Sequence, residues 1–341
     1  MTESALKCTG VDAKTELGFD DEEMSNFTND SAMMIAWERA LESKRPDALF
    51  NDPLAAALAG TKGEKLSDDF GGMCKMFDMP DWPEFHKTWV AVRTRFIDDR
   101  IKECAAAAAA GTTPFGQVVN LGAGVDTRPF RLECYSAFPN GAIDVDMPVI
   151  NQGKLKVMAS PALGSPKPHC CSVETVDLDF LDTERTLATA LVRGGAAAAV
   201  AESAGSAGPG SALEPTPPPP TRFDPAAPTI FYAEGLIMYL GAAGKVKLIE
   251  DVSAVAAPGS VFILQYMDAS HSESAKGNPQ ALASALSVAE ATEDLTKRGW
   301  EGLEFAVFGD DRLNFGRFPS DRFKPSPAFS FCVCRKGSSS V

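Results

Sequence analysis

The residues best suited to bind a ligand lie at 118–128, where the sequence is VVNLGAGVDTR. The apolar start predicts a buried strand, and Gly122 and Gly124, with the small Ala123 between them, predict a sharp turn into a helix. Glycine has no Cβ, so it permits a positive φ and lets a ligand approach the backbone closely. The stretch therefore indicates a nucleotide-type ligand at the end of a strand, although an ordinary tight turn would have the same pattern.

The spacing of the glycines bears on which nucleotide could bind. A dinucleotide-binding turn needs a third glycine three residues after the second, beside the pyrophosphate. Thr127 occupies that position, so the sequence does not indicate room for a pyrophosphate. S-adenosylmethionine carries no phosphate, and we therefore expect this cofactor rather than a dinucleotide.

A second predicted strand ends in acidic residues. Residues 141–148 have the sequence GAIDVDMP, in which Asp144 and Asp146 lie on one face of a strand. Asp146 is nearer to the carboxyl end, so it is the residue expected to reach the ligand. A carboxylate there can accept hydrogen bonds from both ribose hydroxyls of a nucleoside, each contributing about 1.5–3 kcal/mol. The alternative is that one or both acids only cap the following helix.

Five segments resemble, in the same order along the chain, motifs of the leucine carboxyl methyltransferase superfamily, which includes many bacterial small-molecule O-methyltransferases. They are residues 39–53, 93–99, 120–132, 176–178 and 228–240. The resemblance extends from about residue 31 to residue 240, and the carboxyl-terminal third matches only as a general pattern of strands and helices. It implies a class I methyltransferase with S-adenosylmethionine as the cofactor.

The resemblance implies that Arg93 and Glu234 hold the methionine part of this cofactor. Arg93 would pair with the carboxylate, a task that suits a planar donor with parallel N–H groups. Glu234 would lie beside the methionine moiety or its ammonium group. Structural roles remain open, because Arg93 or Arg95 could pair with Asp98 or Asp99 on a helix surface. Glu234 could satisfy a buried turn, although a buried carboxylate without a charged partner is costly.

The same resemblance implies the contacts to the nucleoside. The Asp177 carboxylate and the Leu178 backbone would contact the adenine edge, unless Asp177 only caps a helix. The other residues implied in cofactor binding form the turn and hold the ribose, and they are Gly122, Ala123, Gly124 and Asp146.

No residue is identified as the catalytic base. Tyr239 and Arg128 are candidates on the acceptor side, together with Arg131. Tyr239 could equally belong to the core, and the two arginines could hold the first helix in place. Methyl transfer from a sulfonium has an activated leaving group, so it mainly requires orientation and the exclusion of water. A base is needed only when the acceptor is a hydroxyl.

Strand and helix signals alternate from residue 118 onward. The predicted strands are residues 118–121, 143–146, 170–173, 230–233 and 261–266. This alternation predicts an α/β protein with a parallel sheet and helices on both faces. The resemblance specifies the Rossmann-like sheet of class I methyltransferases, in which residues 303–308 and 329–335 would form an antiparallel end.

We expect one core domain preceded by a helical cap, whose helices are interrupted at Pro46 and Pro53. The predicted units are a loosely ordered segment (1–30), the cap with a lead-in helix (31–115), the methyltransferase core (116–336), a disordered insertion in the core (194–222) and a tail (337–341). The insertion is almost entirely Ala, Gly, Ser, Pro and Thr, so it buries too little apolar surface to offset the entropy of ordering. A proline-rich ligand of SH3-like domains is the alternative.

Composition argues against several classes of function. The chain has 32 Lys and Arg against 46 Asp and Glu, and its net charge of −14 would repel nucleic acid. Residues 1–30 lack the pattern of a signal peptide and no apolar run is long enough to cross a bilayer, so we expect a cytoplasmic protein without a membrane partner. The 8 cysteines and 3 histidines show no metal-ligand spacing, so we expect reduced thiols and no metal.

The sequence therefore predicts a methyltransferase that acts on an oxygen, in a carboxylate or a hydroxyl, of a small organic molecule. The segments at 39–43 and 93–96 look closer to the bacterial small-molecule branch than to the branch that acts on a protein carboxyl terminus. That protein branch is the first alternative. A non-catalytic S-adenosylmethionine-binding sensor is the second. The oligomeric state is not indicated.

Overall fold

A mixed sheet forms the centre of this computed structural model, which describes residues 21–76, 81–193, 221–268, 283–318 and 326–338. The strands are β1 (Gln117–Leu121), β2 (Gly141–Asp146), β3 (Val173–Asp177), β4 (Thr229–Ala233), β5 (Val261–Tyr266), β6 (Trp300–Phe308) and β7 (Ser326–Lys336). They lie in the order β3-β2-β1-β4-β5-β7-β6. Strands β1 to β5 are parallel, and β7 is antiparallel to both β5 and β6. The predicted α/β sheet with an antiparallel end is confirmed.

The strand order reverses direction at β1, which has β2 on one side and β4 on the other. In sheets of this kind, ligands bind outside the carboxyl ends of the strands at such a point. The register places Leu121, the last residue of β1, beside Val145 and Ala233. The residues that follow these positions, Gly122, Asp146 and Glu234, are therefore brought together at one edge of the sheet.

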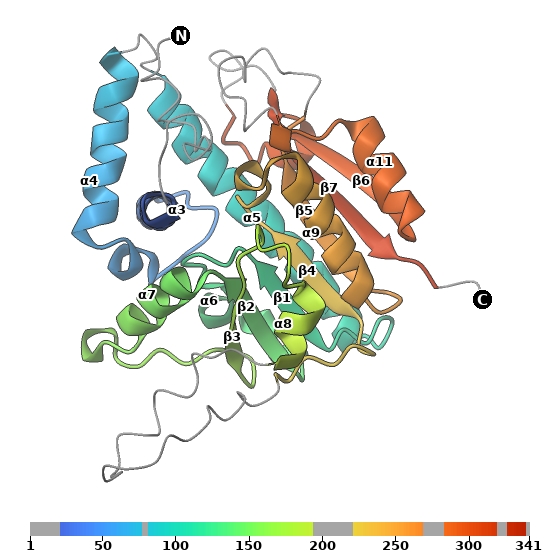
Figure 1. Cartoon of the computed structure of the whole chain (residues 1–341). Helices are drawn as coiled ribbons and strands as arrows, with labels where there is room; N and C mark the ends of the chain where they lie inside the picture. The colour runs from blue at the N-terminus through green and yellow to red at the C-terminus, as the bar shows by residue number, and fades with distance from the viewer. Residues whose placement is uncertain (1–20, 77–80, 194–220, 269–282, 319–325, 339–341) are drawn as a thin grey trace.

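Helices cover both faces of the sheet, and a group of helices projects to one side (Figure 1). The helices are α3 (Asp21–Ser43), α4 (Ala55–Met76), α5 (Trp82–Ala109), α6 (Arg128–Arg131), α7 (Pro148–Met158), α8 (Leu187–Arg193), α9 (Gly241–Val255) and α11 (Val288–Lys297), with the 3-10 turns η1 (Glu133–Ala137), η2 (Pro161–Leu163), η4 (Ile237–Tyr239) and η6 (Asp311–Leu313). Helices α3 and α4 form the cap, and α5 runs from the cap to the sheet (Figure 1).

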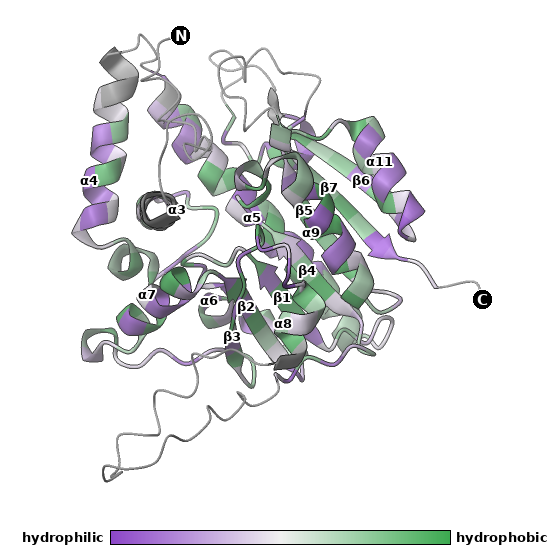
Figure 2. Cartoon of the chain, in the orientation of Figure 1, coloured by the Kyte–Doolittle hydropathy of each residue, from purple (hydrophilic) through white to green (hydrophobic). Residues whose placement is uncertain are grey.

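Alternation along the strands produces two apolar cores. Val119 and Leu121 face one core, which includes residues of α8, α9 and α11. Val118 faces the other core, which includes Trp89 and Ile97 of α5. Figure 2 shows largely hydrophobic residues along the central strands, whereas the outer helix α11 also carries hydrophilic ones. The sheet is thus held rigidly between two packed layers, and its carboxyl edge can position side chains precisely.

The cap begins earlier than the sequence analysis predicted. Residues 1–30 were expected to be loosely ordered, but helix α3 starts at Asp21, and residues 1–20 lie outside the described part. Pro46 and Pro53 lie in the connection between α3 and α4, as expected.

Strand β3 begins at Val173, so the strand predicted at residues 170–173 was placed too early. Three of the five residues of β3, VETVD, are polar, which suits its position at the edge of the sheet. The apolar pair Cys170 and Cys171 suggested a strand but lies in the preceding turn. Of the predicted insertion at 194–222, residues 194–220 lie outside the described residues.

Candidate functional site

The glycine turn follows β1 directly and has the predicted strained backbone. Gly122 and Gly124 have φ values of 69° and 50°, which residues other than glycine rarely adopt. The amides of Gly122 and Ala123 both donate to the carbonyl oxygen of Val145, at 2.8 and 3.1 Å. A Cβ on Gly122 would lie 3.0 Å from the Leu236 side chain. The turn is therefore fixed against β2 and against the segment after β4, and it presents its backbone at the carboxyl edge.

Asp146, at the end of β2, faces this turn. One of its oxygens accepts a hydrogen bond from the Gly124 amide at 2.6 Å, and the other accepts one from the Met147 amide at 2.7 Å. Burial raises the pKa of Asp146 to about 6. Asp144 instead pairs with Lys154 at 2.6 Å. Of the two acids on this strand, Asp146 is thus the one at the crevice, as the sequence analysis expected.

Arg93 and Glu234 meet at the same edge. The Arg93 guanidinium on α5 donates to Glu234, the first residue after β4, at 2.8 Å. Arg128 binds the other oxygen of Glu234, also at 2.8 Å. Burial alone would raise the pKa of Glu234, but the charges of Arg128 and Arg93 outweigh it, and the pKa is lowered. Glu234 is thus a largely buried carboxylate with two cationic partners. Of the alternative helix-surface pairs, Arg95 binds Asp99 at 2.7 Å, whereas Arg93 pairs with neither Asp98 nor Asp99.

Arg128 lies at the centre of this ionic cluster and is only 2% exposed. Besides Glu234 it binds Asp98 on α5 at 2.8 Å and Asp126 after the glycine turn. Its guanidinium lies over the Tyr232 ring, 5.3 Å from the centroid. An acceptor molecule cannot contact so buried a group. The geometry favours the structural alternative, in which Arg128 joins α5, the turn and β4.

The cap is joined to the glycine turn by the same cluster. Arg39 on α3 binds Asp52 at 2.9 Å and the carbonyl oxygen of Val125 at 2.7 Å. Asp52 also accepts a hydrogen bond from Thr127 at 2.7 Å. Arg131 binds Asp98 through two bonds of 2.6 and 2.7 Å, which continues the cluster to α5.

The cluster is balanced in charge, because it contains four arginines and four carboxylates. Its members are Arg39, Arg93, Arg128, Arg131, Asp52, Asp98, Asp126 and Glu234. The sequence analysis identified Arg39 and Asp52 only as part of a family-like segment and did not assign them a role. A role for these two residues could have been inferred from charged side chains at positions that the helix periodicity predicts to be buried.

The predicted adenine contacts fit only in part. The Asp177 carboxylate lies at the crevice edge and accepts a hydrogen bond from Asn151 at 2.8 Å. The Leu178 amide, however, donates to the carbonyl oxygen of Asp146 at 2.9 Å. This sheet bond occupies the only backbone donor of Leu178, so in this structure that N–H group does not face the ligand. Helix α8 begins at Leu187, and Asp177 does not cap it.

Tyr239 lies where the cap meets the core. Its hydroxyl is 3.2 Å from the Ser31 hydroxyl on α3, and burial raises the pKa of the phenol. Tyr239 therefore contacts the cap helix α3, and its phenol is neutral at physiological pH.

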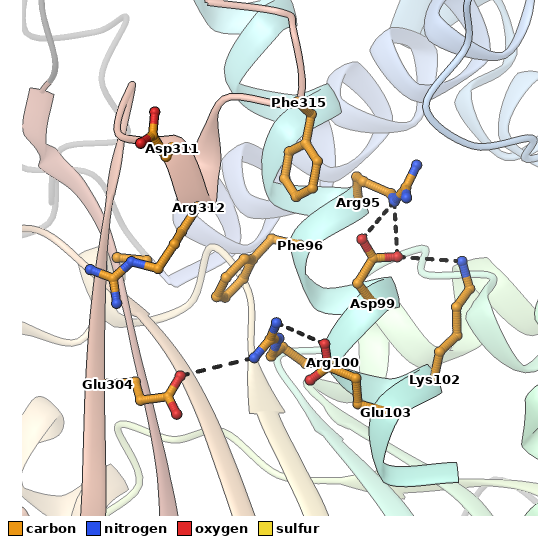
Figure 3. A pocket seen from close by; sticks show the side chains of 11 residues that line it. Arg95, Phe96, Asp99, Arg100, Lys102, Glu103, Glu304, Asp311, Arg312 and Phe315 are labelled. Atoms are coloured by element: carbon orange, nitrogen blue, oxygen red, sulfur yellow. Dashed lines mark hydrogen bonds and ion pairs between the residues drawn. The ribbon is translucent and has the colours of Figure 1, made fainter. Parts of the chain in front are cut away.

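A separate pocket of about 500 Å³ lies on the outer side of α5, against β6 and η6 (Figure 3). Its charged residues are largely paired with one another, for example Asp99 with Arg95 at 2.7 Å and Arg100 with Glu103 at 2.8 Å. The side chains of Phe96 and Phe315 also line it. None of the residues predicted to bind the cofactor lines this pocket, so it is distinct from the crevice described above.

Two absences concern the part of the chain that the structure describes. No group of three or more His, Cys, Asp or Glu in that part of the chain could hold a metal ion. No helix there is long and apolar enough to cross a membrane.

Comparison with known proteins identifies the family. The leucine carboxyl methyltransferase model matches residues 32–203. A protein of Parafrankia sp. (strain EAN1pec), provisionally named an S-adenosyl-L-methionine-dependent methyltransferase, is 35% identical over 288 residues, which cover 82% of this chain and 74% of the relative. A similarly named protein of Mycolicibacterium smegmatis is 30% identical over 256 residues, or 72% of this chain and 69% of the relative. This chain therefore belongs to the leucine carboxyl methyltransferase family.

Among solved structures, a DUF574 family protein from Streptomyces avermitilis has a TM-score of 0.48 at 16% identity, and the match covers 90% of this chain and 97% of that one. The family match and the strand order together identify a class I methyltransferase fold. The protein is an S-adenosylmethionine-dependent methyltransferase, and S-adenosylmethionine is its cofactor.

The buried position of Arg128 leads to a stability prediction. We expect Arg128→Met to lower the free energy of unfolding by about 3–5 kcal/mol, because three buried carboxylates lose a cationic partner. The control is Arg95→Met, since Arg95 forms a partly exposed pair with Asp99, and its loss should cost at most about 1 kcal/mol. Urea unfolding followed by circular dichroism measures both values. Equal, small decreases in the free energy of unfolding of the two variants would show that the cluster does not stabilise the fold.

Proposed function

We propose that this protein transfers the methyl group of S-adenosylmethionine to an oxygen, in a carboxylate or a hydroxyl, of a small organic molecule. The supporting observation is the closeness of the cap to the crevice. Helix α3 contacts η4 through Ser31 and Tyr239 and contacts the glycine turn through Arg39 and Val125. An acceptor must therefore fit beneath the cap, which favours a small molecule over the tail of a folded protein.

The residues at the crevice fit the cofactor. Asp146 would accept the ribose hydroxyls, the turn of Gly122 to Gly124 would lie beneath the methionine part, and Asp177 would contact the adenine. Arg93 and Glu234 would take the methionine carboxylate and ammonium. The carboxylate and ammonium form a zwitterion without net charge. It can therefore bind between Arg93 and Glu234 without leaving an uncompensated buried ion.

When bound, the cofactor supplies a methyl group on a positively charged sulfur. The protein's own contribution is to orient the acceptor in line with that group and to exclude water, which can lower the barrier by as much as about 7–11 kcal/mol. A carboxylate acceptor is already ionised at neutral pH and needs no base. A hydroxyl acceptor must transfer its proton to a neighbouring group.

The raised pKa of Asp146 leads to a prediction for cofactor affinity. Ribose hydroxyls donate to the ionised carboxylate, so binding favours the charged form. We expect the affinity for S-adenosylhomocysteine to be constant above about pH 7 and to fall, by up to tenfold per pH unit, below the Asp146 pKa of about 6. Isothermal titration calorimetry between about pH 5 and pH 8 measures this dependence.

The matched variants for this titration are Asp146→Asn and Asp224→Asn. Asp146→Asn should bind more weakly, with little dependence on pH. Asp224 is exposed and lies before β4, at the opposite edge of the sheet, so its variant should behave as wild type. Wild-type affinity that does not change with pH, or an unaffected Asp146→Asn, would contradict the assignment of Asp146 to the ribose.

The acceptor class is tested by methyl transfer. Phenols, aliphatic and aromatic carboxylic acids, thiols, amines and a peptide ending in a free leucine carboxylate are each incubated with enzyme and methyl-labelled cofactor. We expect labelled product from small oxygen acceptors. Transfer to the peptide alone would favour the protein-carboxyl alternative. Tight binding of S-adenosylhomocysteine without transfer to any acceptor would favour the sensor.

A further inference from the structure

A histidine and a glutamate form a buried pair between α5 and the cap. The Nδ1 atom of His86 lies 2.9 and 3.0 Å from the two carboxylate oxygens of Glu38. The Glu38 side chain is 1% exposed and the His86 side chain 17%. The ring of Phe70 on α4 lies 5.3 Å from the imidazole, centroid to centroid. Residues from three helices thus hold the imidazole in one orientation.

Helix periodicity relates this pair to the cofactor crevice. His86 precedes Arg93 by seven residues on α5, so the two lie on nearly the same face, about 10 Å apart along the axis. On α3, Ser31 likewise precedes Glu38 by seven residues, and Ser31 contacts Tyr239. The faces of α3 and α5 that carry the His86–Glu38 pair therefore also carry the contacts to η4 and to Glu234. Along both helices, the pair therefore lies two turns from a contact to a segment after β4.

The pair has the chemistry of a base held by a carboxylate. With Nδ1–H donated to Glu38, the imidazole keeps a lone pair on Nε2 that can accept a proton. Nε2 has no hydrogen-bond partner among the described residues. Of the two candidates from the sequence, Arg128 is buried in the ionic cluster, and burial raises the pKa of the Tyr239 phenol. Neither offers a nitrogen lone pair that can accept a proton.

We propose that His86 is the general base for a hydroxyl acceptor and that Glu38 positions it. The proposal rests on the proposed function and extends it by naming hydroxyls as the acceptor class. The acceptor oxygen gives its proton to Nε2 of His86 and forms the new bond to the methyl carbon while the carbon–sulfur bond breaks. The electron pair of that bond stays on sulfur, and the imidazolium that forms is neutralised by the Glu38 carboxylate.

The test compares acceptors of similar shape that differ in their need for a base. Phenol is protonated at mildly alkaline pH, whereas 4-nitrophenol is already ionised. We expect His86→Gln to reduce kcat for phenol by about 10²–10⁴-fold and kcat for 4-nitrophenol by less than about tenfold. Glu38→Gln should reduce kcat for phenol to an intermediate degree. The control His169→Gln changes an exposed histidine and should leave both rates unchanged.

Calorimetry with S-adenosylhomocysteine separates this proposal from the proposed function. If His86→Gln binds S-adenosylhomocysteine with wild-type affinity, a decrease in kcat that is confined to phenol supports His86 as the general base. An equal decrease in kcat for phenol and 4-nitrophenol, or no decrease, overturns the assignment of His86 as the base. Neither result would contradict the proposed methyltransferase activity. Failure of the wild-type protein to bind S-adenosylhomocysteine would instead contradict the proposed crevice.

A second measurement needs no turnover. In the complex with S-adenosylhomocysteine, the imidazole ¹⁵N resonances of His86 are assigned by their loss in His86→Gln. We expect phenol to shift the Nε2 resonance of His86 and to leave the His169 resonances in place. His86 resonances that stay unchanged while phenol saturates the complex would overturn the proposal.

Discussion

The site depends on a buried contact between the Arg128 guanidinium and carboxylates from three separate elements. Arg128 joins Asp98 of α5, Asp126 after the glycine turn and Glu234 after β4. A buried ion is tolerated only when its partners compensate the lost hydration, and these contacts supply that compensation. Because each partner comes from a different element, the helix, the turn and the strand end cannot shift independently, and the crevice between them keeps its shape without a ligand.

In the proposed complex, this edge would hold the amino-acid part of the cofactor, which is a zwitterion. Arg93 and Glu234 provide one positive and one negative group beside each other. Asp146 lies at the glycine turn, where it accepts a hydrogen bond from the Gly124 amide. The cap adds a further constraint, since Arg39 binds the carbonyl oxygen of Val125. Movement of the cap would therefore be transmitted to the glycine turn, which couples the cap to the proposed cofactor site.

The parts of this site that the sequence predicted are those set by local rules. A strand followed by a glycine turn, and the choice of Asp146 over Asp144, follow from the period of a strand and the position of its carboxyl end. The unpredicted parts depend on contacts between distant segments. Arg39 and Val125 are 86 residues apart, and His86 and Glu38 are 48 apart. The bond from the Leu178 amide to the Asp146 carbonyl oxygen likewise joins two strand ends that no local motif relates.

The most direct measurement compares two ligands that share adenosine and sulfur but differ in the amino-acid part. 5′-Methylthioadenosine lacks the carboxylate and the ammonium of S-adenosylhomocysteine, so it does not need Arg93. The account predicts that Arg93→Met weakens S-adenosylhomocysteine binding by at least about tenfold, as expected for a charged hydrogen bond, and leaves 5′-methylthioadenosine binding unchanged. Equal affinity of Arg93→Met and wild type for S-adenosylhomocysteine would contradict the assignment of this ionic pair to the cofactor.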